Sequence, residues 1–182
     1  MYVVREGNET IFELDPATLK PKRRFLIDRT YEGNANYLRR GGDGVEGLTF
    51  VPNSDDPEGG TFYVVNQYDP PVLVELAVPL RSSKERIARA EIRAAWPLGP
   101  PPLSDVVWDA PTKSFLVPSA LWHSALVVTR GGIKKGSVRL PGFMQEGIAR
   151  LPDGSFVIAQ DSGGLIKWKP EGDPFAAAGS GK

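Results

Sequence analysis

Acidic and amide side chains stand at recurring places beside short apolar segments of this chain. A carboxylate opens such a segment three times, and an amide or a carboxylate follows one twice. The five residues are Glu46, Asp105, Glu146, Asn66 and Asp161. Their hard oxygen atoms are the ligands that Ca²⁺ prefers, roughly six to eight of them when waters are included. Calcium is therefore the candidate metal, with these five residues as its predicted ligands.

A structural role is the alternative for the same side chains. An architecture that repeats its strands also repeats its packing contacts. Glu and Asp at the beginnings of strands can accept backbone hydrogen bonds from neighbouring units, or simply face water. The repetition alone does not separate a metal site from this structural role.

The single histidine, His123, lies between Trp122 and Ser124 in a predicted loop. Beside a carboxylate, an imidazole can act as a general base near neutral pH. The spacing identifies no such partner, so His123 is a weak catalytic candidate and a packed loop residue is the alternative. No serine stands in a Gly-x-Ser-x-Gly nucleophile elbow.

Polar and aromatic residues follow the predicted second strand of several units. Loops that leave such strands often carry binding residues. We predict that four of them rim a ligand pocket or a partner surface: Gln67, Tyr68, Trp122 and Gln160.

The composition is that of a soluble domain. Lys and Arg number 22, as do Asp and Glu, so no overall field recruits a polyanion. The absence of cysteine excludes disulfides and thiolate sites. No apolar run approaches the roughly 20 residues of a membrane span, and the start resembles no signal peptide. A cytoplasmic location is expected if Met1 is the biological start, and the compartment is otherwise undetermined.

Short apolar segments recur as a unit with variable loops, and 20 Gly with 17 Pro favour strands joined by turns. Two copies are clear, at 45–76 and 145–168. The centres of the second strands are Val3, Val64, Leu116 and Val157, spaced by 61, 52 and 41 residues. Units of about 40–50 residues match a four-stranded propeller blade. We predict an all-β β-propeller with about four recognisable blades, two complete and two partial, or a fragment of a six-bladed ring.

The predicted propeller covers residues 1–172, with blade units at about 1–28, 45–95, 104–140 and 145–169. A charged segment after each third strand is the expected outer strand. In the second blade this segment alternates over 88–94, which favours a strand, although Ser82 to Glu85 could instead cap a helix. The tail 173–182 is predicted to be disordered.

The strand count does not close a ring, because the first unit lacks an inner strand and the last lacks an outer one. Open strand edges are normally covered in native proteins. A protein partner or additional propeller blades are therefore expected at the exposed edges.

The motifs resemble those of the SdiA-regulated (YjiK-like) propellers. The resemblance covers roughly 45–169 and rests on Glu46-Gly47-Leu48 before the strand ending in Asn66-Gln67, and on Glu146-Gly147-Ile148 before the strand ending in Gln160-Asp161. It implies a propeller related to six-bladed hydrolases of the paraoxonase type, which often hold calcium in the channel. The chain departs from this pattern in its blade number and in having Ser104-Asp105 where Glu-Gly would stand.

Basic clusters occur at 20–24 and 134–135, on the predicted outer strands or their entry loops. Lys and Arg commonly protect exposed sheet edges. Because the total charge is balanced, we favour edge protection over phosphate binding and predict no nucleic-acid partner.

Two functions follow. The preferred one is a non-enzymatic propeller that binds a ligand or protein partner at the channel mouth. The alternative is a calcium-dependent hydrolase of esters, lactones or phosphoesters, with metal-bound water or a metal-polarised carbonyl.

Overall fold

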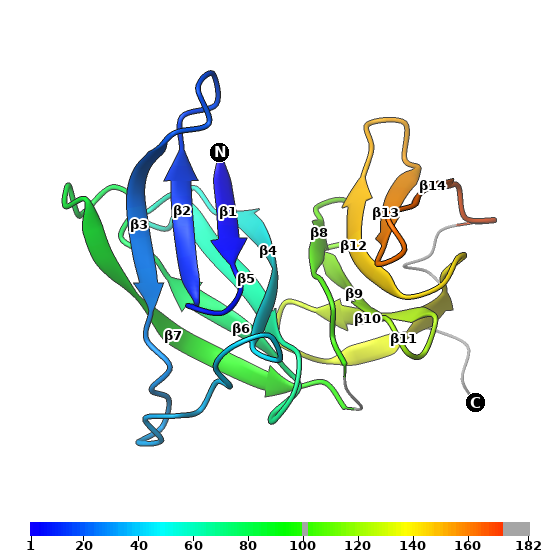
Figure 1. The fold of residues 1–182 in the computed structure, drawn as a ribbon, viewed down its shortest axis with the longest axis horizontal. Coiled ribbons are helices and arrows are strands. Elements are labelled where there is room, and N and C mark those ends of the chain that lie inside the picture. Colours follow the sequence, from blue (N-terminus) through cyan, green and yellow to red (C-terminus); the bar gives the residue numbers. More distant parts are fainter. Residues whose placement is uncertain (100–101, 173–182) are drawn as a thin grey trace.

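The computed structural model describes residues 1–99 and 102–172, and the predicted all-β class is confirmed. Fourteen strands are present, and the described residues contain no helix (Figure 1). The strands are β1 Tyr2–Arg5, β2 Thr10–Leu14, β3 Pro21–Ile27, β4 Val45–Pro52, β5 Gly60–Asn66, β6 Val72–Ala77, β7 Ile87–Pro97, β8 Val107–Asp109, β9 Ser114–Ser119, β10 Ser124–Thr129, β11 Lys134–Arg139, β12 Gln145–Arg150, β13 Phe156–Gln160 and β14 Leu165–Trp168. The predicted tail at 173–182 lies outside the described residues.

The strands form propeller blades. β4–β7 and β8–β11 are four-stranded antiparallel meanders, which we name blade 2 and blade 3. β1–β3 form the three-stranded blade 1, and β12–β14 form the three-stranded blade 4. The alternating segment 88–94 lies within β7, so the predicted strand is confirmed.

Blades 1 and 2 are joined into one sheet, which the sequence did not predict. β3 pairs in parallel with β7, Arg24 to Ile27 lying beside Ile87 to Ala90. The resulting seven-stranded sheet has the order β1-β2-β3-β7-β6-β5-β4, and it curls until its edge strands β1 and β4 touch (Figure 1). The prediction that the basic cluster at 20–24 protects a sheet edge is therefore wrong, because β3 has a neighbouring strand on each side. β11 does lie at a sheet edge.

The core lies between successive blades in three clusters. Every residue of β5 is buried, and so is every residue of β9. Side chains alternate across a strand. Phe62 and Val64 of β5 accordingly pack against blade 1, whereas Tyr63 and Val65 pack against blade 3. Each central strand thus binds two neighbouring blades together.

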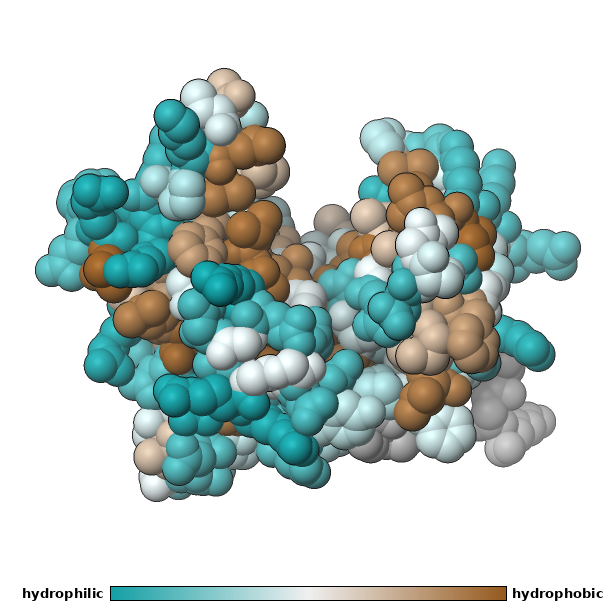
Figure 2. Space-filling view, viewed as in Figure 1, coloured by the Kyte–Doolittle hydropathy of each residue, from teal (hydrophilic) through white to brown (hydrophobic). Residues whose placement is uncertain are grey.

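The outline of the molecule is open. The space-filling view has the orientation of Figure 1 and shows hydrophobic side chains exposed on blade 1 and on blade 4, with a hollow between these two blades (Figure 2). The described residues contain no helical segment with the length and apolar character needed to cross a bilayer.

Gly47 fixes how closely blades 2 and 3 approach. Its φ is +59°, and a Cβ built there would lie 2.7 Å from both Asp105 Cα and the Val106 nitrogen. Backbone atoms cannot withdraw as a flexible side chain can. Glycine is therefore required at this position for both conformation and space.

We predict that Gly47→Ala lowers the free energy of unfolding by about 2–4 kcal/mol, because left-handed strain adds to a backbone clash. Gly163→Ala is the matched control, since Gly163 has φ +83° but open space around its Cβ position. Gly163→Ala should lower the free energy of unfolding only by the cost of the left-handed conformation, about 1–2 kcal/mol. Urea unfolding measures both, and equal losses would contradict the clash.

Candidate functional site at the mouth of the propeller axis

Carboxylates from four blades meet at one end of the propeller axis. Glu46 on β4 interacts electrostatically with Glu146 on β12 and with Asp105, which precedes β8. Glu6, just after β1, lies within hydrogen-bonding reach of Glu46. The structure therefore brings together three of the five predicted ligands and adds a carboxylate that was not predicted. We refer to Glu6, Glu46, Asp105 and Glu146 as the acidic mouth.

Glu46 is the most perturbed group of the acidic mouth. Burial raises its pKa from the ordinary 4.5 to about 8, and the neighbouring charges of Glu6, Glu146 and Asp105 add to this effect. A protonated Glu46 can donate a hydrogen bond to the Glu6 carboxylate. Near neutral pH this side chain is therefore largely neutral and becomes an anion only in alkaline solution.

Asp105 has the structural role that was the alternative for these carboxylates. Its Oδ1 accepts a 2.7 Å hydrogen bond from the Val106 nitrogen, and its Oδ2 accepts one of 2.7 Å from the Ile148 nitrogen of blade 4. Burial raises its pKa to about 6, although both hydrogen bonds act in the opposite direction. Beside it, Ser104 donates to the Gln145 carbonyl oxygen at 2.7 Å. Asp105 thus ties blade 3 to blade 4.

Asp161, a fourth predicted ligand, interacts with Glu146 and extends the acidic mouth along blade 4. Both side chains are exposed. Desolvation, with the charges of Asp161 and Glu6, raises the pKa of Glu146. Among the described residues neither carboxylate accepts backbone hydrogen bonds as Asp105 does, so Glu146 is more accessible to a ligand than Asp105.

Asn66 is not part of the acidic mouth. Its Nδ2 donates to the carbonyl oxygens of Tyr68 at 2.5 Å and of Pro70 at 2.8 Å. These bonds hold the loop that contains the cis peptide Asp69–Pro70. Its buried Oδ1 accepts no hydrogen bond from the described residues. The amide is committed to the loop between β5 and β6.

The acidic mouth does not form a metal cage. Across residues 1–99 and 102–172, no three acidic or imidazole side chains converge closely enough to enclose a metal ion. Both carboxylate oxygens of Asp105 accept hydrogen bonds from backbone nitrogens, and the Asn66 amide donates to a carbonyl oxygen of its own loop. The residues present do not fit a multidentate calcium site in this arrangement, and calcium binding stays a prediction.

His123 lies in the turn between β9 and β10 in a left-handed conformation, with φ of 47°. Its ring centroid is 5.1 Å from that of Phe143, and its buried Nδ1 has no hydrogen-bond partner among the described residues. Within residues 1–99 and 102–172, no carboxylate forms an ion pair with the imidazole. In the part of the chain that the structure describes, His123 has a packing contact with Phe143 and no partner that could orient it for catalysis.

The four predicted rim residues have different surroundings. The backbone N–H of Gln67 donates a hydrogen bond to the Gly44 carbonyl oxygen, and that of Tyr68 donates to the Asp43 carbonyl oxygen. These bonds fix the loop after β5. The Oε1 of Gln160 accepts a 2.7 Å hydrogen bond from the Phe143 nitrogen, a structural contact. Trp122 is 60% exposed. A rim role for these residues stays a prediction.

The sequence offered no signal for Glu6. The dipeptide Glu-Gly occurs six times in the chain, at positions 6, 32, 46, 58, 146 and 171. Only two of these begin a strand unit of the recognised kind. Glu6 approaches Glu46 because the curled sheet brings β1 to β4, and that curl depends on the parallel pairing of β3 with β7.

We predict that the chain loses stability as pH rises from about 4.5 to about 8. The folded state holds the Glu46 proton more tightly than the unfolded state, so its contribution is complete below pH 4.5 and is lost as pH passes the folded pKa of about 8. Glu46→Gln removes this titration and should unfold at a higher temperature than the parent at pH 8.5.

The exposed Glu91 of β7 provides the control. Glu91→Gln should follow the parent at every pH in thermal unfolding monitored by circular dichroism. If Glu46→Gln also follows the parent between pH 5 and pH 9, the perturbed carboxyl is not Glu46.

No family model and no curated protein matches this chain. Its resemblance to the SdiA-regulated propellers therefore stays a prediction. Several solved structures are similar in fold. Hydrazine synthase from Kuenenia stuttgartiensis matches with a TM-score of 0.50 and 16% identity over 84% of this chain and 36% of its own.

Two further structures are similar. Virginiamycin B lyase from Staphylococcus aureus matches with a TM-score of 0.49 and 11% identity over 96% of this chain and 56% of its own. A protein of unknown function from Bacteroides caccae matches with a TM-score of 0.47 and 14% identity over 94% of this chain and 69% of its own. The chain thus spans about a third of the synthase and just over half of the lyase. At such identities the similarity concerns the fold alone. The chain is an all-β protein of propeller blades.

Proposed function

We propose that this chain is a non-enzymatic β-propeller segment that binds a ligand or protein partner at the acidic mouth, through a cationic group of that partner. The observation that carries the proposal is the convergence of Glu46, Glu6 and Glu146. Three glutamates from three blades meet there, and burial and the surrounding acidic side chains raise the pKa of Glu46. A cation placed among them would relieve their mutual repulsion.

The same electrostatics give the binding a pH dependence. At neutral pH a proton on Glu46 offsets the repulsion. A cationic group has to displace this proton, because only the ionised form of Glu46 attracts a cation. Affinity should therefore increase as pH rises towards and past about 8, with release of a proton on binding.

Isothermal titration at pH 8.5 tests the proposal with two probes, a trilysine peptide and calcium chloride. We expect the parent to bind trilysine and the double variant Glu46→Gln/Glu146→Gln to bind it about tenfold more weakly or not at all, since charge-assisted contacts are lost. Binding by the parent should weaken at pH 6.5.

Glu91→Gln serves again as the matched control, because it removes one exposed negative charge outside the acidic mouth. Equal affinity of the parent and the double variant would show that trilysine binds elsewhere. Stoichiometric binding of calcium without binding of trilysine would replace the organic cation with the metal.

A hydrolase gains no support from the residues around His123, which packs on Phe143 rather than on a carboxylate. Catalysis needs a base held by an orienting partner and placed near the reacting atoms. We therefore propose binding, and a calcium result would be the reason to return to ester and lactone substrates.

We also propose that a protein partner or a further blade covers the outer face of blade 4, at the open end of the chain of blades. Ala149 pairs with Val157, and Ala159 pairs with Leu165, so these four side chains share the face opposite to Ile158, which packs against blade 3. Leu165 is 74% exposed. An apolar row of this kind is typical of a surface that another blade covers.

A second copy of the chain is the simplest partner to test. We expect the parent to gain mass with concentration in light scattering and Leu165→Asp to stay monomeric at an unchanged unfolding temperature, since the side chain is exposed. A parent that is monomeric at every concentration would rule out self-association through this face.

A further inference from the structure

A groove of about 500 Å³ opens where β2, β3 and β7 come together, well outside the acidic mouth. Its volume falls within the range of small-ligand sites, roughly 300–1,000 Å³. Four of its lining residues are basic, Lys22, Arg23, Arg24 and Arg86, and none is acidic. This concentration of positive charge stands out in a chain whose formal net charge is zero.

Strand register places the floor of the groove on the face of blade 1 that points away from blade 2. Phe12 pairs with Arg24 across β2 and β3, and Arg24 pairs with Ile87 across β3 and β7. Paired residues share a face of the sheet. The neighbouring pair Ile11 and Phe25 points the other way, into the core with blade 2. The groove thus combines an aromatic ring and an aliphatic side chain with cations.

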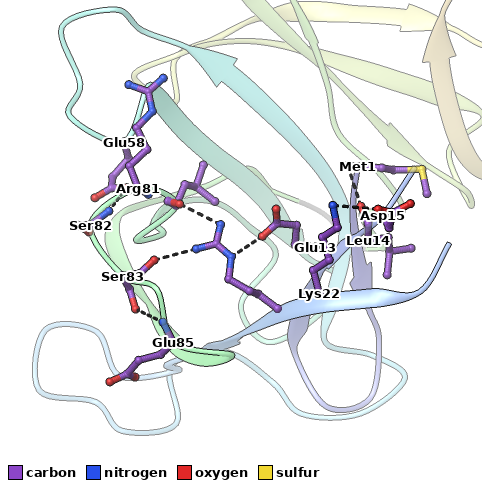
Figure 3. A network of polar contacts seen from close by, with 12 residues as sticks. Met1, Glu13, Leu14, Asp15, Lys22, Glu58, Arg81, Ser82, Ser83 and Glu85 are labelled. Atoms are coloured by element: carbon purple, nitrogen blue, oxygen red, sulfur yellow. Dashed lines mark hydrogen bonds and ion pairs between the residues drawn. The ribbon is translucent and has the colours of Figure 1, made fainter. Parts of the chain in front are cut away.

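Arg23 holds the wall of the groove in place through hydrogen bonds of its guanidinium group. Figure 3 shows two of the residues that accept these bonds, Glu13 and Ser83, on facing segments. The Nε of Arg23 donates to Glu13 at 2.5 Å, and its Nη1 and Nη2 donate to the carbonyl oxygens of Ser83 and Leu80, both at 2.9 Å. These bonds clamp the β6–β7 loop against blade 1, and Arg86 belongs to that loop. The Arg23 side chain is only 17% exposed and its charge is paired with Glu13, so it is not available to a ligand.

Arg24 and Arg86 are different, because both are exposed and neither side chain forms a hydrogen bond or ion pair with the described residues. Lys22 pairs with Asp15 at 3.0 Å and keeps 54% of its side chain exposed. The groove therefore presents two unpaired guanidinium groups and one partly neutralised amine. A guanidinium is suited to a carboxylate, which it can bind through two parallel hydrogen bonds.

The charge on this face argues against a covering blade. Faces between blades are apolar here, as in the three core clusters. The face of blade 1 that carries the groove instead displays Arg24 beside Leu26, which is 41% exposed, and Ile87, which is 45% exposed. Burying unpaired guanidinium groups under another blade would be costly.

We propose that this groove binds a short acidic peptide segment of a partner protein, with carboxylates on Arg24 and Arg86 and an apolar side chain on Phe12 and Ile87. A nucleic acid fits less well. It requires an extended set of cations along its backbone. Here Asp15 and Glu13 neutralise Lys22 and Arg23, which leaves two free cations.

Fluorescence anisotropy tests the proposal with a labelled, end-blocked peptide of alternating glutamate and leucine. We expect the parent to bind it and Arg24→Gln/Arg86→Gln to bind it at least about tenfold more weakly, since two charge-assisted contacts are lost. Binding should weaken with salt, as expected for exposed charges. The double variant should keep its unfolding temperature, because both side chains are exposed.

Arg139→Gln on β11 is the matched control, since Arg139 is also exposed on an outer strand. It should bind the peptide like the parent. Failure of the parent to bind, or equal binding by the double variant, would overturn the proposal. Equal binding of a lysine–leucine peptide, or tighter binding of a short single-stranded oligonucleotide, would also overturn it. Each of these results is independent of the trilysine titration, which concerns the acidic mouth.

Discussion

In β5, consecutive side chains pack against different blades, Phe62 and Val64 against blade 1 and Tyr63 and Val65 against blade 3. β9 is buried in the same way. A strand with two apolar faces is stable only when each face is covered, so the blades must stack side by side. The beginnings of their first strands then meet at one end. The acidic mouth is a consequence of this stacking.

Close contacts at the axis make the stacking specific. Asp105 accepts a hydrogen bond from Ile148 of the next blade and lies against Gly47 of the preceding one. Thr49 accepts a 3.1 Å hydrogen bond from the Trp108 nitrogen, and Arg150 pairs with Asp109. The carboxylate that seemed equivalent to its neighbours in sequence has become a structural link, whereas Glu46 and Glu146 remain with raised pKa values. Equivalent positions in a repeat thus serve different purposes.

The two proposed surfaces have opposite charge and different origins. Three carboxylates of the acidic mouth, Glu46, Asp105 and Glu146, arise from repetition, because successive blades begin with them at the same end, and Glu6 joins them where β1 meets β4. The basic groove arises from the parallel pairing of β3 with β7, which departs from the antiparallel order within the blades. This pairing brings Arg24 and Arg86, which are 62 positions apart in the sequence, to one groove. A chain with no net charge can therefore carry two surfaces of strong and opposite charge.

The sequence by itself determined the strands and the blade units, because alternation and turn residues are local properties that burial enforces. β7 and the second strands at Val64, Leu116 and Val157 all lie where their patterns predicted. Only the tertiary structure decided which polar residues meet. Glu6 joined the acidic mouth, Asn66 turned to its loop, and β3 gained a second neighbour. Those outcomes depend on contacts between segments far apart in the chain, and no local pattern in the amino acids records them.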